Sequence, residues 1–199
     1  MNSQLSPESS IVELSPRAFC RTATVEDLPR LELLEANAYG GHAAEPMETY
    51  AKRIAEFPEG CWVLEVKEQL IGHCFFERWA VVGADLVKLK ESLVLHQKSP
   101  WKAEGGNCLY LASLAVHPQF QGNGWGHWLC IQALTRIFKS TPRLKLVSLV
   151  VAESNEKAMS LYLRLGFHHS FKIRNGYYEE EPRRPVWFMT ANRSQLKLL

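Results

Sequence analysis

A glycine-rich turn between a buried strand and an amphipathic helix is the feature that most constrains this chain. The run LASLAVHPQFQGNGWGHWL, residues 111–129, begins with an apolar strand pattern and ends at the start of a helix. Between the two lie three alternating glycines, Gly122, Gly124 and Gly126. Glycines at the mouth of a helix let the backbone turn tightly and point free amides outward, where the helix dipole favours an anion. We therefore expect this turn to hold a phosphate group through main-chain amides.

Two common phosphate-binding motifs do not fit this turn. A P-loop ends in G-K-S or G-K-T, whereas this turn continues as G-W-G-H. The dinucleotide fingerprint requires the order G-x-G-x-x-G, but here the glycines alternate and position 127 is His127. The sequence therefore disfavours both ATP chemistry and a Rossmann dinucleotide site.

The turn resembles instead the pyrophosphate loop of the GNAT superfamily of acyl-CoA-dependent N-acyltransferases, whose pattern is Q/R-x-x-G-x-G/A. Gln121, Gly124 and Gly126 match that pattern, and the preceding V-H-P, residues 116–118, is also typical of the family. The family's next helix often reads N-x-x-A-x-x-x-Y-x-x-x-G-F. Five residues stand at those positions: Asn155, Ala158, Tyr162, Gly166 and Phe167. Two motifs in the right order on the right elements make the resemblance specific.

The resemblance implies an α/β fold of the GNAT type, with a mixed, mostly antiparallel central sheet flanked by helices and with splayed central strands. Apolar spacing predicts an order of strand, two helices, three strands, helix, strand, helix and two strands. Thr24 is expected to cap the first helix, Asn155 to open the last and Gly166 to end it. The predicted strands after the first, which lies near Phe19, cover residues 62–66, 71–76, 108–116, 144–151, 167–173 and 186–191.

The length of 199 residues suits one domain. Residues 1–16 are rich in Ser, Pro and polar side chains and are expected to form a polar N-terminal arm, either loose or packed on the domain. Residues 17–199 are expected to form a single GNAT acetyltransferase domain. Within it, residues 81–107 keep no steady period, and a loop of that length suggests a lid on the acceptor side.

Composition excludes several classes of protein. The net charge is +2, too small to drive phosphate-dominated binding, so no nucleic-acid partner is expected. The longest apolar runs are far shorter than a membrane span, and the N-terminus lacks a secretory pattern, so we expect no membrane partner and a cytoplasmic location. The five cysteines lack a C-x-x-C pair and are expected to be reduced core thiols. The histidine spacing predicts no metal site.

Acetyl-CoA is the co-substrate that the resemblance implies, bound without a metal. Leu114 and Val116, on a splayed strand, would pair with the pantetheine amides as an added strand would. Asn155 would cap its helix and also reach the pantetheine arm, although capping alone would explain an Asn there. The predicted acetyl-CoA-binding residues are Leu114, Ala115, Val116, Gln121, Gly122, Asn123, Gly124, Trp125, Gly126, His127 and Asn155.

Two tyrosines are the predicted catalytic residues. Tyr162 matches the family's general acid, because a phenol keeps its proton at neutral pH and can give it to a thiolate. Tyr110 stands where other members carry a Glu base, and a tyrosine is a poor base unless its pKa is lowered or it only orders a water chain. The segment ESLVLH, residues 91–96, faintly resembles the serotonin N-acetyltransferase branch. That branch has a histidine pair where this chain has Tyr110 and Ala112. The unranked alternatives for the base are His73, Glu77 and Glu91.

The function expected from these residues is direct acetyl transfer to a primary amine. The acceptor is either a small aryl-, alkyl- or polyamine-like molecule or a peptide N-terminus, and the protein is a monomer or a homodimer. Aromatic and acidic side chains could line a pocket for the ammonium group, or they could simply pack; these are Tyr39, Phe75, Trp79, Trp101, Glu45, Glu91 and Glu104. The alternative function is a non-catalytic acyl-CoA-binding module that regulates a partner.

Overall fold

The computed structural model of this chain describes residues 18–39, 45–80, 106–174 and 184–198. The predicted arm over residues 1–16 and nearly all of the predicted lid over residues 81–107 lie outside these ranges. Both therefore stay predictions.

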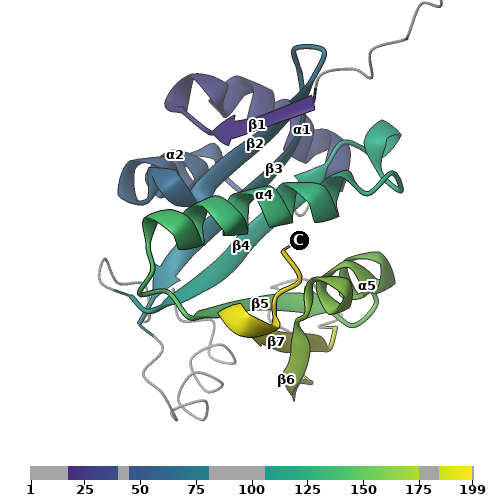
Figure 1. Ribbon diagram of the computed structural model, residues 1–199. Helices are drawn as coiled ribbons and strands as arrows, with labels where there is room; N and C mark the ends of the chain where they lie inside the picture. Colours follow the sequence, from purple (N-terminus) through teal and green to yellow (C-terminus); the bar gives the residue numbers. More distant parts are fainter. Residues whose placement is uncertain (1–17, 40–44, 81–105, 175–183, 199) are drawn as a thin grey trace, which may run out of the picture.

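Seven strands form one twisted sheet in the order β1-β2-β3-β4-β5-β7-β6 (Figure 1). Among these strands only β4 and β5 are parallel neighbours, and every other neighbouring pair is antiparallel. The predicted mixed, mostly antiparallel sheet is confirmed. The strands are β1 (Ala18–Thr22), β2 (Cys61–Val66), β3 (Gln69–Trp79), β4 (Cys108–Val116), β5 (Leu146–Ala152), β6 (His168–Ile173) and β7 (Val186–Asn192).

Helices cover both faces of the sheet (Figure 1). On one face, Leu34 and Ile54 pack with Phe75 in a buried cluster. On the other, Leu134 packs with Leu64. Each fully buried Leu, Ile or Phe contributes roughly 1.5–3 kcal/mol by leaving water, so both layers stabilise the sheet. The first layer is α1 (Leu28–Tyr39) and α2 (Met47–Glu56), and the second is α4 (Trp125–Ser140) and α5 (Glu156–Leu165).

The helix ends follow from local side chains. Thr24 and Asp27 form the predicted capping box, although its first turn, Val25–Asp27, is a 3-10 helix that leads into α1. Arg21 on β1 holds the Asp27 carboxylate through bonds of 2.6 and 2.7 Å, which ties this turn to the sheet edge. Gly166 ends α5 in the left-handed conformation at φ 100°, where any side chain would collide with the Gln195 carbonyl.

The cysteines are structural. All five are free thiols, and all but the half-buried Cys20 lie in the interior, as the sequence predicts. Burial raises the pKa of Cys108 to about 12, so this thiol stays protonated and unreactive. In the described ranges, no group of His, Cys, Asp or Glu side chains is arranged to hold a metal ion. None of the helices described there has the length and apolarity needed to cross a bilayer.

Candidate functional site

The central strands β4 and β5 pair over only half their length. Cys108–Leu111 pairs with Leu146–Leu149, and the ladder then stops. On the other side of β4 the pairing with β3 continues to Val116, after a bulge at Ala112 that shifts the register. The two strands therefore diverge beyond Leu111, which confirms the predicted splay and leaves one edge of β4 open.

Leu114 and Val116 direct their backbone groups into this opening. The His117 amide donates to the Ile71 carbonyl on β3 at 2.8 Å. Bonding direction alternates along an antiparallel ladder, so Ala115 also bonds toward β3, whereas Leu114 and Val116 point the opposite way. Ala115 is thus part of the β3 ladder, and its two neighbours offer the groups that an added strand would use.

Two side chains already occupy carbonyls at this open edge. The Tyr39 hydroxyl, from the last residue of α1, donates to the Leu114 carbonyl at 2.8 Å. The Gln121 side-chain amide donates to the Val116 carbonyl at 2.9 Å. Gln121 therefore fastens the glycine-rich turn to the end of β4, while Tyr39 covers a group that pantetheine would need.

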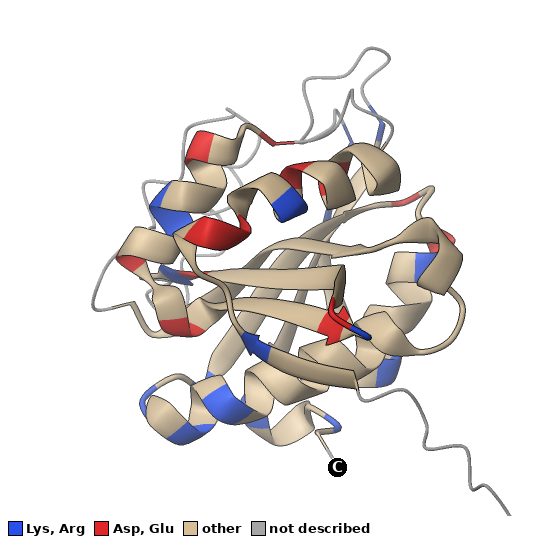
Figure 2. Cartoon of the chain, turned by 90° about the horizontal axis from the view of Figure 1, so that it is seen from above, with Lys and Arg blue, Asp and Glu red and all other residues tan. Residues whose placement is uncertain are grey.

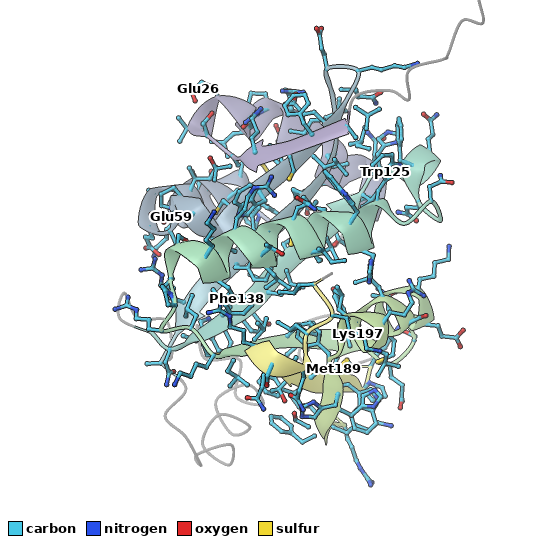
Figure 3. The ribbon with its side chains drawn as sticks, viewed as in Figure 1. Glu26, Glu59, Trp125, Phe138, Met189 and Lys197 are labelled. Atoms are coloured by element: carbon cyan, nitrogen blue, oxygen red, sulfur yellow. The ribbon has the colours of Figure 1, made fainter. Side chains whose placement is uncertain are left out.

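The glycine-rich turn leads directly into α4. Gly122 and Gly124 have φ of 81° and 82°, and a side chain built on either would meet no protein atom within 4 Å. The first amide bonded within the helix is that of Trp128, to the Gly124 carbonyl at 2.9 Å. Figure 3 labels Trp125 at this end of α4 and Phe138 toward the other end.

The amides of the first helical turn come before Trp128 in the chain. They therefore have no carbonyl within the helix to which they could donate a hydrogen bond. They belong to Trp125, Gly126 and His127. In the turn itself, the Asn123 side chain bonds the Gln121 carbonyl at 3.3 Å and steadies the loop. Burial, and next the Arg164 charge, lower the pKa of His127, so its imidazole is neutral at pH 7. Open space next to glycines and unbonded amides is the arrangement that accepts a pyrophosphate.

The middle of α5 lies near the beginning of α4. The Asn155 side chain accepts a bond from the Ala158 amide at 3.1 Å, as the capping prediction requires. Tyr162 is 8% exposed, and its ring meets Phe167 edge-on with centroids 5.8 Å apart. A Cβ on Gly126 would lie 3.2 Å from Leu161, so α4 and α5 approach closely here.

Tyr110 lies on the opposite face of β4 from Tyr162. Its ring stacks on Trp79 with centroids 3.8 Å apart and planes 13° from parallel. The Trp79 indole donates to Glu77 at 3.1 Å. Phe75 and Trp79 are fully buried, so these two members of the expected aromatic pocket pack in the core instead. Trp101, Glu91 and Glu104 lie outside the described residues.

A buried ion-pair network continues from Glu77, and the sequence analysis missed its centre. Arg53 on α2 is 6% exposed and donates to Glu77 at 2.9 Å. Arg53 also forms two hydrogen bonds to Glu45. Burial opposes the Arg53 charge, but the bonds to Glu45 and the nearby Glu77 outweigh it and raise the pKa of Arg53. The sequence contained one indication of this buried arginine. Arg53 falls on the apolar stripe of a short helix, one residue before Ile54.

His73, one of the alternatives for the base, has a partner that the sequence analysis also missed. Its Nε2 lies 2.5 Å from Glu35 Oε1, and both side chains are almost fully buried, at 0% and 1% exposed. Glu35 follows Leu31 by one helical turn and so falls on the buried stripe of α1. A buried carboxylate needs a hydrogen-bond partner inside the protein. His73 on β3 is that partner.

Known proteins were compared with the chain by sequence and by structure. A family model for the acetyltransferase (GNAT) family matches residues 28–167. No curated protein matches the chain by sequence. The ribosomal-protein-S18-alanine N-acetyltransferase from Escherichia coli is similar in structure, with 20% identity, a TM-score of 0.64 and coverage of 88% of this chain and 94% of that one.

Two further similar structures contain an acyl-CoA or an analogue. The GNAT-like decarboxylase GphF in complex with isobutyryl-CoA has 20% identity, a TM-score of 0.69 and coverage of 87% and 98%. Naa50 from Arabidopsis thaliana in complex with the bisubstrate analogue CoA-Ac-MVNAL has 19% identity, a TM-score of 0.60 and coverage of 87% and 97%. At such identities these structures establish the fold alone. Because the family model covers more than half of the residues, the chain belongs to the GNAT acetyltransferase family.

Proposed function

We propose that this protein is an acetyl-CoA-dependent N-acetyltransferase that transfers the acetyl group directly to a primary amine. The observation that carries the proposal is the opening between β4 and β5, which has outward backbone groups on one edge and the unbonded amides of α4 at its end. The first set suits the amides of pantetheine, and the second suits a pyrophosphate. The acyl-CoA ligands of GphF and Naa50 support the same use of the fold.

In the proposed reaction the amine nitrogen attacks the thioester carbonyl, the new C–N bond forms and the C–S bond breaks. Tyr162 gives its proton to the departing thiolate. Its ring packs in the interior against Phe167, which would hold the hydroxyl in one place during transfer. The amine must lose a proton before or during the attack, so a base is needed on the acceptor side of β4.

The charge of the α1 and α2 layer supports a cationic acceptor. Acidic residues are concentrated on this layer, whereas α4 on the other face carries no acidic residue (Figure 2). A negative field attracts ammonium groups and raises their local concentration. Both a small amine and a peptide N-terminus fit this field. The acidic residues between positions 23 and 60 are Glu26, Asp27, Glu32, Glu35, Glu45, Glu48, Glu56 and Glu59, against the basic residues Arg30, Lys52 and Arg53.

We place this reaction in the cytoplasm, where thiols stay reduced. The five free cysteines of the chain support that location.

The proposal is tested by thiol release from acetyl-CoA with a panel of amines: 2-phenylethylamine, spermidine and an alanine-initiated peptide. We expect thiol release that depends on at least one amine, with the acetylated amine detected by mass spectrometry. Gly124→Val, which strains the glycine-rich turn, should weaken acetyl-CoA binding. Acetyl-CoA binding without use of any amine would favour the non-catalytic module instead. Release of CO2 from malonyl-CoA would favour decarboxylation, the activity named for GphF.

A further inference from the structure

Four polar side chains from four different elements lie together behind β4. Ser113 lies on β4, Tyr50 on α2, Glu35 on α1 and His73 on β3. The Tyr50 hydroxyl lies 3.1 Å from Ser113 Oγ, and the Tyr50 ring meets the His73 ring edge-on with centroids 5.4 Å apart. Glu35 in turn holds His73 at 2.5 Å. The set runs from half-buried Ser113, next to the open edge of β4, into the interior of the protein.

Burying these polar side chains in the core costs free energy. Glu35, Tyr50 and His73 are buried almost completely, and His73 Nδ1 has no hydrogen-bond partner in the part of the chain that the structure describes. Each buried polar group loses its water, and an unpaired one costs about 1–3 kcal/mol. Apolar side chains of similar size would join α1 and α2 to the sheet at no such cost. Stability alone therefore does not explain the set.

The electrostatic environment suits the passage of a proton. Burial, and next the Glu35 charge, raise the pKa of Tyr50, so this phenol passes one proton on only as it receives another. The Arg53 guanidinium lies 5.6 Å from the Tyr50 ring centre and is paired with Glu45 and Glu77. Because two carboxylates offset the Arg53 charge, a proton that enters the set meets no uncompensated cation.

We propose that Glu35 and His73 accept the proton of the attacking amine, with Ser113 and Tyr50 as the relay. The proposal rests on the proposed acetyl transfer and supplies a base other than the predicted Tyr110. Before the nitrogen attacks, one ammonium proton passes to Ser113 Oγ, the Ser113 proton to Tyr50 and the Tyr50 proton to the Glu35 carboxylate. Both relay hydroxyls end as they began, and one proton has moved from the ammonium to the Glu35–His73 pair. The neutral amine then attacks, and the second proton that its nitrogen loses replaces the proton that Tyr162 gives to the thiolate.

The test uses two forms of one acceptor. Each amine that the wild-type protein acetylates is compared with its β,β-difluoro derivative, which is close in size but has a much lower amine pKa, so that a far larger fraction of it is neutral at pH 7. Glu35→Gln and Tyr50→Phe keep the shape of their side chains and interrupt the relay. We expect each to lower kcat/KM for the protonated amine at least about tenfold at pH 7 and to change the acidic limb of its pH profile. For the difluoro amine the loss should be below about twofold.

The control is Thr190→Val on β7. Thr190 is a buried hydroxyl that also lies between a serine and a histidine, 2.7 Å from Ser170 and 3.2 Å from His168, but β5 separates it from β4. The Thr190→Val variant should leave kcat/KM unchanged for both the protonated amine and the difluoro amine. Should Glu35→Gln fail to fold, the half-buried Ser113→Ala gives the same comparison.

The outcomes separate the two proposals. A loss confined to the protonated amine supports the relay. Equal losses with both amines would show that the set only positions α1 and α2, and no loss would show that the proton leaves by another route; either overturns the relay while acetyl transfer stands. If the wild-type protein acetylates no amine, the proposed function fails first and the relay fails with it.

Discussion

The two faces of β4 hold their polar groups in opposite ways. On the side of α4 and α5, the groups that would bind the pyrophosphate are backbone amides from one short turn, for which the described residues supply no hydrogen-bond partner. On the side of α1 and α2, the polar groups are side chains from separate elements, buried and paired, with Arg53 and Glu35 at the centre. The α4 and α5 side would bind the charge of a ligand, whereas the α1 and α2 side contains charged side chains that pair with one another.

This contrast has a physical consequence for mutation. A backbone site depends on φ and ψ of a few consecutive residues, so a side chain in the wrong place disturbs binding but little else. A buried side-chain network also helps two helices to pack on the sheet. Removal of one member therefore lowers the free energy of unfolding. Mutations on the α4 and α5 side of β4 should therefore change mainly the affinity for acetyl-CoA. Mutations on the α1 and α2 side should change mainly the free energy of unfolding.

The largest effect is expected from Arg53→Met. Methionine keeps most of the volume, but Glu77 loses a bond of 2.9 Å and Glu45 loses both of its bonds to the guanidinium. Breaking a buried ion pair costs about 3 kcal/mol or more, measurable as a fall in the free energy of unfolding in urea. The matched control is Lys52→Met, whose exposed pair with Glu56 should cost under about 1 kcal/mol. Equal losses in the two variants would contradict the contrast.

Tyr162→Phe should lower kcat on the order of 10²-fold, because only the proton donor to the thiolate is removed. The ring contact with Phe167 stays, so acetyl-CoA affinity and the unfolding midpoint should barely change. The alkaline limb of the rate profile should change as well, since a group that must stay protonated no longer titrates. Full activity with an unaltered alkaline limb would remove Tyr162 from the mechanism.

Gly124→Val should weaken acetyl-CoA binding at least tenfold, or about 1.4 kcal/mol, in a calorimetric titration. Gly124 has φ of 82°, a conformation that a β-branched residue strongly resists, so the amides at the start of α4 must shift. Lys139→Val places the same side chain in the last turn of α4 and should leave affinity unchanged. If both variants bound acetyl-CoA like the wild type, the pyrophosphate would have to lie elsewhere.

The smallest effect is expected from Tyr39→Phe, which frees the Leu114 carbonyl at the open edge of β4. A hydrogen bond of this kind is worth about 0.5–1.5 kcal/mol, and the lower end applies here because the bond is exposed to solvent, so acetyl-CoA affinity should rise about two- to threefold. Weaker binding would mean instead that the Tyr39 hydroxyl contacts the ligand. Fluorescence titration is sensitive enough to tell the two results apart.

Much of the fold could be predicted because its signals are local. The alternation of β4, the glycines before α4, the Asn155 cap and the Gly166 stop each depend on neighbours close in the chain. The partners of His73 and Glu77 could not be predicted in this way. Glu35 and Arg53 are charged residues on short helices, and in the sequence only their position on an apolar stripe indicates that they are buried.

By itself, the sequence determined the fold class, the family and the backbone of the segment that we propose for acetyl-CoA, because a contiguous strand, turn and helix set their own backbone geometry. The tertiary structure alone decided the ion pairs on the side of α1 and α2. Their charges come from residues far apart in the chain, and which carboxylate meets which cation depends on how α1 and α2 lie across β3 and β4. Coulombic and hydrogen-bond energies fall steeply with distance, so these partners follow from three-dimensional packing and not from spacing in the chain.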